Sequence, residues 1–167
     1  MNVSIKGLDE ILKKLGPAIV QEPLENFFKR AAIKVQSSAR QKTPVDTGGE
    51  RNRLMYEVST DNARVGFLDA SPGSELFYQA RAMEYGTGRM GDPAVSHSAT
   101  HFPPGPKLEL WAARHGFQSG WQVAKIIARR GGLKPRHMLK DGLAESMSAL
   151  QGFANQLGKE IAERWSK

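Results

Sequence analysis

The sequence contains no cysteine, which excludes disulfide bonds, thiolate catalysis and zinc sites built from cysteine. Long apolar runs are also missing: each spans only a few residues, whereas a membrane-spanning helix needs about 20. The first residues lack the apolar core of a signal peptide. We therefore expect a protein that is made in the cytoplasm and has no membrane partner.

Acidic residues are almost absent from one part of the chain. Between residues 107 and 140 a single acidic residue, Glu109, stands against eight basic ones, so this segment has a net charge of +7. The whole chain also has a net charge of +7, and the remainder is therefore neutral. A surface that is basic on one side attracts acidic partners, such as nucleic acid or a negatively charged protein ring. Five of these basic residues are Lys125, Arg129, Arg130, Lys134 and Arg136.

The usual patterns of catalytic and cofactor sites are missing as well. The pair His97 and His101 has the spacing of a helical metal site, but no carboxylate lies between them and the surrounding sequence is typical of a loop. Gly86-Thr87-Gly88 lacks the third glycine of a phosphate-binding loop. Glu84 and Asp46 would form a carboxylate pair only if the fold brought them together. We therefore predict a protein that is not an enzyme and that holds no cofactor or metal.

Length and composition are those of an ordinary globular protein. The 167 residues suffice for one domain with its own core, and the hydrophobic and charged fractions of 40% and 25% are typical of soluble proteins. We expect a single domain over residues 1–167.

The segment Thr43-Pro44-Val45-Asp46-Thr47-Gly48 predicts the end of a helix and the start of a strand. Its proline fixes φ and disfavours helical geometry at the residue before it, while the polar residues and the closing glycine suit a chain reversal. The helix before the turn is expected to start near Pro23, because apolar residues follow that proline at helical spacing: Leu24, Phe27, Phe28, Ala31, Ala32, Val35 and Ala39. Further upstream we expect a short strand at Val3 and Ile5, then a two-turn helix over residues 8–15 that ends at Gly16-Pro17.

After the turn, the sequence predicts a β-hairpin. Alternating residues 54, 56 and 58 form the first strand, Asp61-Asn62 supplies the reversal, and residues 64–68 form the second strand. The segment from Leu76 to Tyr85 fits either a helix or a strand. Phe77, Ala80 and Met83 suit a helix, while Ala82, Glu84 and the aromatic ends suit a strand that ends at Gly86. We expect a third strand over residues 81–85, because an isolated hairpin is only marginally stable.

The C-terminal half predicts a long loop followed by helices. Residues 88–105 combine glycine, proline and small polar residues without a period. A basic helical insertion over residues 106–134 holds one helix that opens with Pro106 and another that opens with the capping pattern Ser119 and Gln122. A last long helix carries an apolar seam: Leu139, Leu143, Met147, Leu150, Ala154, Leu157 and Ile161. The tryptophans, Trp111, Trp121 and Trp165, are expected to be core or interface anchors.

The expected fold class is α+β: a small antiparallel β-sheet packed against a long helix in the N-terminal half, with additional C-terminal helices.

Four motifs follow one another along the chain: Ile5-Lys6-Gly7-Leu8-Asp9-Glu10, Ala39-Arg40-Gln41-Lys42-Thr43-Pro44-Val45-Asp46-Thr47-Gly48-Gly49-Glu50-Arg51, Glu84-Tyr85-Gly86-Thr87 and Pro135-Arg136-His137-Met138-Leu139. In these motifs the chain resembles the neck and tail-completion family of tailed bacteriophages, small proteins encoded between the head and tail genes that join or terminate the tail. It departs from the family pattern at Glu50, where leucine is usual, and at His137-Met138, where proline and phenylalanine are usual. Its segment 93–132 is longer than in the shortest members.

The resemblance implies a non-enzymatic structural protein of the virion that forms a homo-oligomeric ring, hexameric in the particle. Its partners would be neck, head-closure or tail-tube proteins, and DNA would pass through the channel. An alternative from another class is a basic nucleic-acid-binding protein that uses the helix over residues 121–130.

The resemblance also suggests where partners bind. We expect residues 46–51 and 84–87 to lie together at one end of the sheet, with the loop after Gly88 against an adjacent subunit. The expected assembly interface consists of Thr43, Pro44, Val45, Asp46, Thr47, Gly48, Arg51, Glu84, Tyr85, Gly86 and Thr87. The basic side chains that would face DNA or an acidic partner ring are Lys125, Arg129, Arg130, Lys134 and Arg136.

Overall fold

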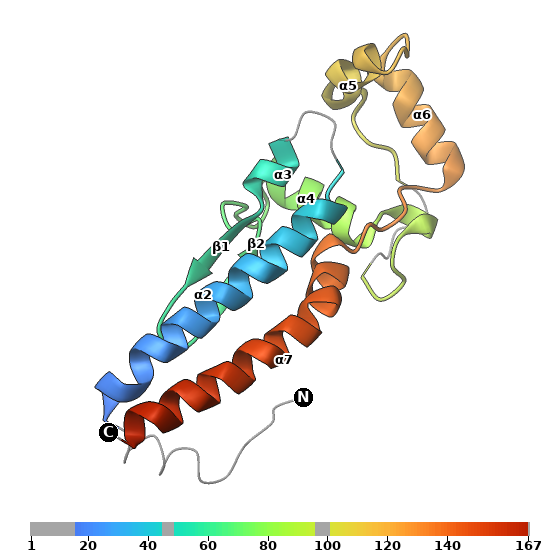
Figure 1. Cartoon of the computed structure of the whole chain (residues 1–167). Coiled ribbons are helices and arrows are strands. Elements are labelled where there is room, and N and C mark those ends of the chain that lie inside the picture. The colour runs from blue at the N-terminus through green and yellow to red at the C-terminus, as the bar shows by residue number, and fades with distance from the viewer. Residues whose placement is uncertain (1–15, 45–48, 96–100, 167) are drawn as a thin grey trace.

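The computed structural model describes residues 16–44, 49–95 and 101–166 (Figure 1). Its elements in chain order are α2 (Pro17–Lys42), α3 (Gly49–Arg53), β1 (Met55–Val58), β2 (Ala63–Gly66), α4 (Glu75–Tyr85), η1 (Gly88–Met90), η2 (Gly105–Leu108), α5 (Glu109–Arg114), α6 (Gly120–Arg130) and α7 (Met138–Trp165). The strand and helix expected over residues 3–15 lie outside the described residues, as do Val45, Asp46, Thr47, Gly48 and His97. Within the described ranges, no helix is both long and apolar enough to cross a membrane.

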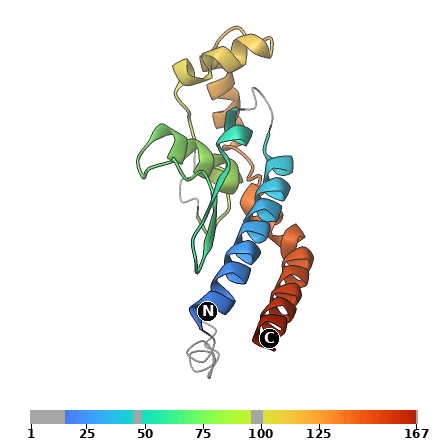
Figure 2. The same ribbon diagram turned by 60° about the vertical axis from the view of Figure 1, so that its left-hand side comes forward.

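Two long helices, α2 and α7, lie side by side and run antiparallel (Figures 1 and 2). Contacts spread along both helices fix their register. They are an ion pair of 2.8 Å between Glu22 and Arg164, stacking of the Arg30 guanidinium 4.4 Å above the Phe153 ring, and an ion pair of 2.5 Å between Lys42 and Glu145.

Buried residues lie along both of these helices, and a further group, Ala112, Val123 and Ala124, lies in α5 and α6. Val20, Ala32 and Ala39 of α2 are buried, as are Met138 and Ser146 of α7. The helices approach closely where Gly142 faces Ala39, because a Cβ on that glycine would lie 2.7 Å from the alanine amide nitrogen. Small residues therefore permit the close packing of the two helices at this point.

The expected hairpin is present, and α2 supports it. β1 and β2 pair antiparallel with Met55 opposite Gly66, and both strands contact α2. Leu54, which precedes β1, is completely buried, and its carbonyl oxygen accepts hydrogen bonds from Gln36 Nε2 at 2.7 Å and Arg40 Nη2 at 2.9 Å. The α+β class is confirmed, with a small antiparallel sheet on a long N-terminal-half helix and further helices after it.

Two predicted boundaries of the N-terminal half are wrong. α2 begins at Pro17, not near Pro23, and Pro17 occupies an early position where its missing N–H costs nothing. Pro23 lies inside the helix and is completely buried, so the packing of its ring offsets the backbone hydrogen bond that it cannot make. The turn after α2 also leads first into the short helix α3 and only then into the strand β1.

The third strand expected over residues 81–85 is wrong, because this segment forms the last turns of helix α4. The hydroxyl of Ser74 caps α4 by accepting a hydrogen bond of 3.2 Å from the Phe77 amide. The apolar residues at helical spacing therefore determine the local structure. The hairpin packs on α2 instead of a third strand, and in the described part of the chain the sheet has two strands.

The helices expected after Pro106 and Ser119 are present and pack against each other as a lobe of η2, α5 and α6. This lobe, residues 105–130, stands at one end of the molecule, away from the paired length of α2 and α7 (Figures 1 and 2). The Ser119 hydroxyl accepts from the Gln122 amide at 3.3 Å, and Gly131 ends α6 in the left-handed conformation. The expected capping pattern is confirmed.

The apolar seam expected on α7 is buried only in part: its partly buried residues are Leu139, Leu150, Leu157 and Ile161, and its exposed residues are Leu143, Met147 and Ala154. Met138, Gly142 and Ser146 are the buried residues of this helix, whereas Leu143 and Met147 are exposed. Trp121 and Trp165 are exposed too, so neither is a core residue. Small residues fill the contact with α2, because the close approach of the two helices leaves no room for leucine or methionine there.

Candidate functional site

The buried carboxylate of Glu84 caps the N-terminus of α7. Glu84 lies in the last turn of α4 and is only 5% exposed. Its two oxygens accept hydrogen bonds of 2.9 Å from the Leu139 amide and 3.0 Å from the Lys140 amide. These amides belong to the first turn of α7, which has no intrahelical acceptor for them, and a negative charge at this end is also favoured by the helix dipole. His137, at the N-cap position, makes no side-chain capping bond.

Backbone hydrogen bonds extend this contact on both sides. The amides of Arg136 and His137 donate to the carbonyl oxygens of Met83 and Glu84 at 2.8 and 3.1 Å. The Thr87 amide donates to the Leu133 carbonyl at 2.9 Å, and the Leu133 amide donates to the Thr87 hydroxyl at 3.0 Å. We call residues 83–88 together with residues 131–140 the joint.

Two glycines are required by the close approach of the two segments of the joint. Gly86 has φ 69°, and a Cβ there would lie 2.7 Å from the Pro135 nitrogen. Gly132 has φ 122°, and a Cβ there would overlap the Thr87 carbonyl oxygen. Both positions combine a left-handed backbone with contact to another backbone, a combination that glycine alone accommodates without strain.

Thr43 is buried and caps the C-terminus of α2. Its amide donates to Ala39 and Arg40 carbonyl oxygens at 3.1 and 3.3 Å, and its hydroxyl donates to the Ala39 carbonyl at 2.9 Å. Arg51 Nε donates to the Arg40 carbonyl at 2.9 Å, so a cation also lies at the negative end of the helix dipole. The helix stop predicted before Pro44 is confirmed, since α2 ends at Lys42.

The motif of residues 39–51 and the motif of residues 84–87 both contact the first turns of α7. Ala39 packs against Gly142, and the Lys42 ammonium pairs with the Glu145 carboxylate, whose hydrogen bond raises the pKa of Lys42. Glu84, which belongs to α4, binds the amides of the first turn of the same helix. Among the residues expected at the assembly interface, Thr43, Glu84 and Gly86 are buried within the chain, and Tyr85 is exposed.

The predicted basic residues all lie at the surface. Within the part of the chain that the structure describes, none of them forms an ion pair, and they are Lys125, Arg129, Arg130, Lys134 and Arg136. The first three belong to α6 and the other two to the segment that leads into α7. Their charges therefore remain available to an acidic partner.

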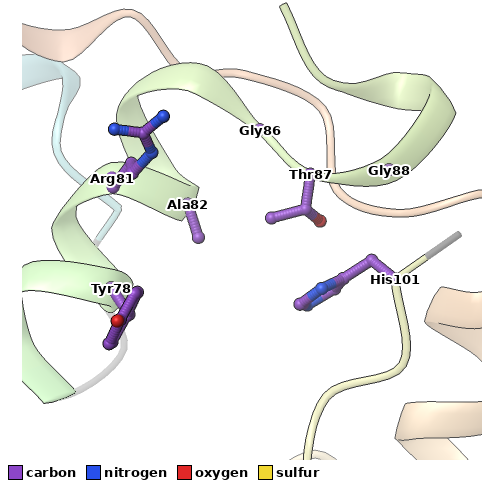
Figure 3. Close-up of a pocket in the computed structure, with 7 residues that line it drawn as sticks. All are labelled: Tyr78, Arg81, Ala82, Gly86, Thr87, Gly88 and His101. Carbon is purple, nitrogen blue, oxygen red and sulfur yellow. The ribbon is translucent and has the colours of Figure 1, made fainter. Parts of the chain in front are cut away.

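An open pocket of about 370 Å³ lies beside the joint (Figure 3). Tyr78 and Arg81 of α4 lie across it from His101, and Thr87 forms part of its wall. Partial burial lowers the pKa of His101 below its usual value, which favours the neutral imidazole. The Thr87 hydroxyl already accepts the Leu133 amide. The pocket lining thus offers a guanidinium, a phenol and an imidazole, with no carboxylate that could act as a base toward them.

Metal ligands do not gather in the described residues, where no group of three or more His, Asp or Glu side chains could hold an ion. His101 lines the pocket, while its sequence neighbour in the predicted pair, His97, is outside the described residues.

Sequence reasoning missed one surface, the exposed apolar side of α7. Leu143 is 47% exposed and Met147 is 56% exposed. Both belong to the apolar seam that the sequence predicts on this helix. The signal that could have corrected this assignment is the second set of small residues on the same helix, Gly142 and Ser146, which suits a close helix contact better.

Comparison of the chain with models of protein families, with curated proteins and with solved structures gives no match.

Proposed function

We propose that this chain is a structural subunit of a tailed-phage virion, which assembles into a ring at the neck or at the end of the tail and joins head and tail or terminates the tail. The four sequence motifs suggest this role. The joint adds a physical reason for two of them to occur together, since Glu84-Tyr85-Gly86-Thr87 and Pro135-Arg136-His137-Met138-Leu139 bind one another in the fold. As the resemblance implies, we expect a hexameric ring whose neighbours are head-closure, neck or tail-tube proteins.

The observation that carries the proposal is the apolar row on α7, formed by Leu143 and Met147. The row is turned about 100° from the α2-facing position Gly142, because successive helix residues differ by that angle. Fully burying one such side chain is worth about 1.5–3 kcal/mol, and about half of each is still exposed. A helix that exposes apolar side chains beside the side that packs on α2 suits a subunit whose second face is covered by a neighbour.

Genetic complementation tests this role. Deletion of the gene for this chain from the genome that encodes it should yield separate heads and tails in electron micrographs. A copy carrying Leu143→Lys and Met147→Lys should fold, because both side chains are exposed, yet fail to restore joined particles.

The matched control is Ser148→Lys with Asn155→Lys, two exposed polar positions on the same helix. This variant adds the same charge outside the row and should restore particles. Normal infectious particles in the complete absence of the protein would contradict the proposal.

A further inference from the structure

Three exposed residues form a row along α6. Trp121, Lys125 and Arg129 recur every fourth residue, so their side chains lie along one side of the helix in steps of about 6 Å. The Phe102 ring lies beside Trp121 with 6.1 Å between ring centroids. Trp121 is 49% exposed and Phe102 is 53% exposed, which leaves a large part of each ring open to solvent. We call these four residues the α6 row.

The sequence around the α6 row is basic apart from Glu109, whose carboxylate accepts a hydrogen bond of 2.7 Å from the Gly120 amide at the start of α6. No acidic residue occurs between positions 110 and 140 of the sequence. Elsewhere exposed cations do have acidic partners, as in the pairs of Lys107 with Glu75 at 2.6 Å and of Arg164 with Glu22 at 2.8 Å. Lys125 and Arg129 form no ion pair with any residue that the structure describes.

We propose that the α6 row binds single-stranded nucleic acid, with Lys125 and Arg129 on the phosphates and the rings of Trp121 and Phe102 stacked against unpaired bases. Regularly spaced cations recognise a polyphosphate backbone without reading sequence. Exposed aromatic faces beside cations are the other half of such a site, because every unpaired base has a face on which they can stack.

Two other occupants fit the α6 row less well. A duplex keeps its bases paired and stacked inside, so it would use the cations and leave the two rings exposed. An acidic protein surface has no unpaired bases for the two rings, and any basic groups that it carried would find a single carboxylate in residues 107–140, that of Glu109. This inference does not rest on the assembly role, so either one can fail while the other stands.

Fluorescence anisotropy with a labelled oligothymidylate of ~20 nucleotides in ~50 mM salt measures the binding directly. The wild type should bind, and Lys125→Gln with Arg129→Gln should reduce the salt slope, d log K/d log [salt], by up to about 1.4, or about 0.7 for each lost phosphate contact. The matched control is Lys29→Gln with Lys34→Gln, which removes two exposed charges from α2 and should bind as the wild type does.

Substitution of the tryptophan tests the stacking. Trp121→Ala should weaken oligothymidylate binding about fivefold to 150-fold, and Trp121→Phe should recover most of the loss. Because the Trp121 ring also packs on Gly105, the melting temperature of each variant is measured alongside. The Lys125 and Arg129 variant keeps the test decisive if the alanine variant unfolds.

Several results would overturn the proposal. One is absence of binding in ~50 mM salt, and another is equal affinity of the α6 variant and its α2 control. If a polyglutamate peptide of the same length binds as tightly as oligothymidylate, the surface is a protein-docking site. If a duplex of the same length binds as tightly and Trp121→Ala has no effect, only the phosphates are recognised.

Discussion

Replacing Glu84 with alanine removes both acceptors that hold the first turn of α7. Two amides, of Leu139 and Lys140, would lose partners at 2.9 and 3.0 Å in a partly buried place. Loss of an N-terminal cap costs about 0.5–2 kcal/mol, and loss of a charge at the helix N-terminus adds about 0.3–1 kcal/mol, up to ~2 where the group is partly buried. Because Glu84 is buried and binds two amides, we expect a loss of about 2–4 kcal/mol in the free energy of unfolding.

Thermal unfolding followed by circular dichroism measures this loss. For a protein of this length about 1 kcal/mol corresponds to about 2–4 °C, so Glu84→Ala should lower Tm by about 4–16 °C. Glu84→Gln keeps one acceptor oxygen and should fall between alanine and the wild type. The matched control is Glu25→Ala, an exposed glutamate of α2, which should stay within about 0.5 kcal/mol of the wild type. Equal stability of Glu84→Ala and Glu25→Ala would refute the capping role.

Three further predictions concern backbone contacts and one histidine. Gly86→Ala should destabilise by about 3 kcal/mol or more because its Cβ meets backbone, whereas Gly73→Ala, also at positive φ but with open space around it, should lose only about 1–2 kcal/mol in chemical denaturation. Gly142→Ala should lower Tm by forcing α2 and α7 apart, whereas Gly152→Ala, in open space on the same helix, should raise stability by up to about 1 kcal/mol. His101 should titrate below pH 6.5 in an NMR experiment. Because the unfolded chain then takes up the proton at a higher pH than the folded chain does, the free energy of unfolding should decrease as the pH falls below 6.5. An unshifted titration, or equal effects within either glycine pair, would contradict the corresponding prediction.

The parts of the fold that the sequence predicted correctly depend on local signals. The end of α2 before Pro44 follows from proline geometry, and the limits of α6 follow from a capping serine and a glycine that ends the helix. The hairpin follows from alternation on both sides of Asp61-Asn62. Each of these signals acts within a few residues, and packing elsewhere in the protein did not override them.

The wrong predictions concern features that tertiary contacts determine. Residues 81–85 fitted either a helix or a strand and were assigned to a strand because the hairpin needed support, but α2 supplies that support from a distant part of the sequence. The apolar residues of α7 were predicted to form one packed seam, but Leu143 and Met147 are exposed, and the close contact with α2 is made at Gly142. Periodicity identifies an amphipathic helix, and it cannot say which of two adjacent sides meets the neighbour.

The role of Glu84 could not be predicted from the sequence for a similar reason. Its partner Leu139 is 55 residues away, so no local spacing links the carboxylate to the amides that it caps. No sequence pattern indicated the role of Gly86 either, because its contact with the Pro135 nitrogen depends on the complete fold. Two motifs that lie far apart in the sequence therefore form one joint within the chain.

Cryo-electron microscopy of intact particles, produced by the genome that encodes the chain, tests the central proposal most directly. The proposal predicts a ring of copies at the head–tail junction or at the end of the tail, in which antiparallel helices of 26 and 28 residues fit the density of each subunit and the Leu143 side of α7 meets a neighbour. Infectious particles whose neck and tail contain no density for this chain would contradict it.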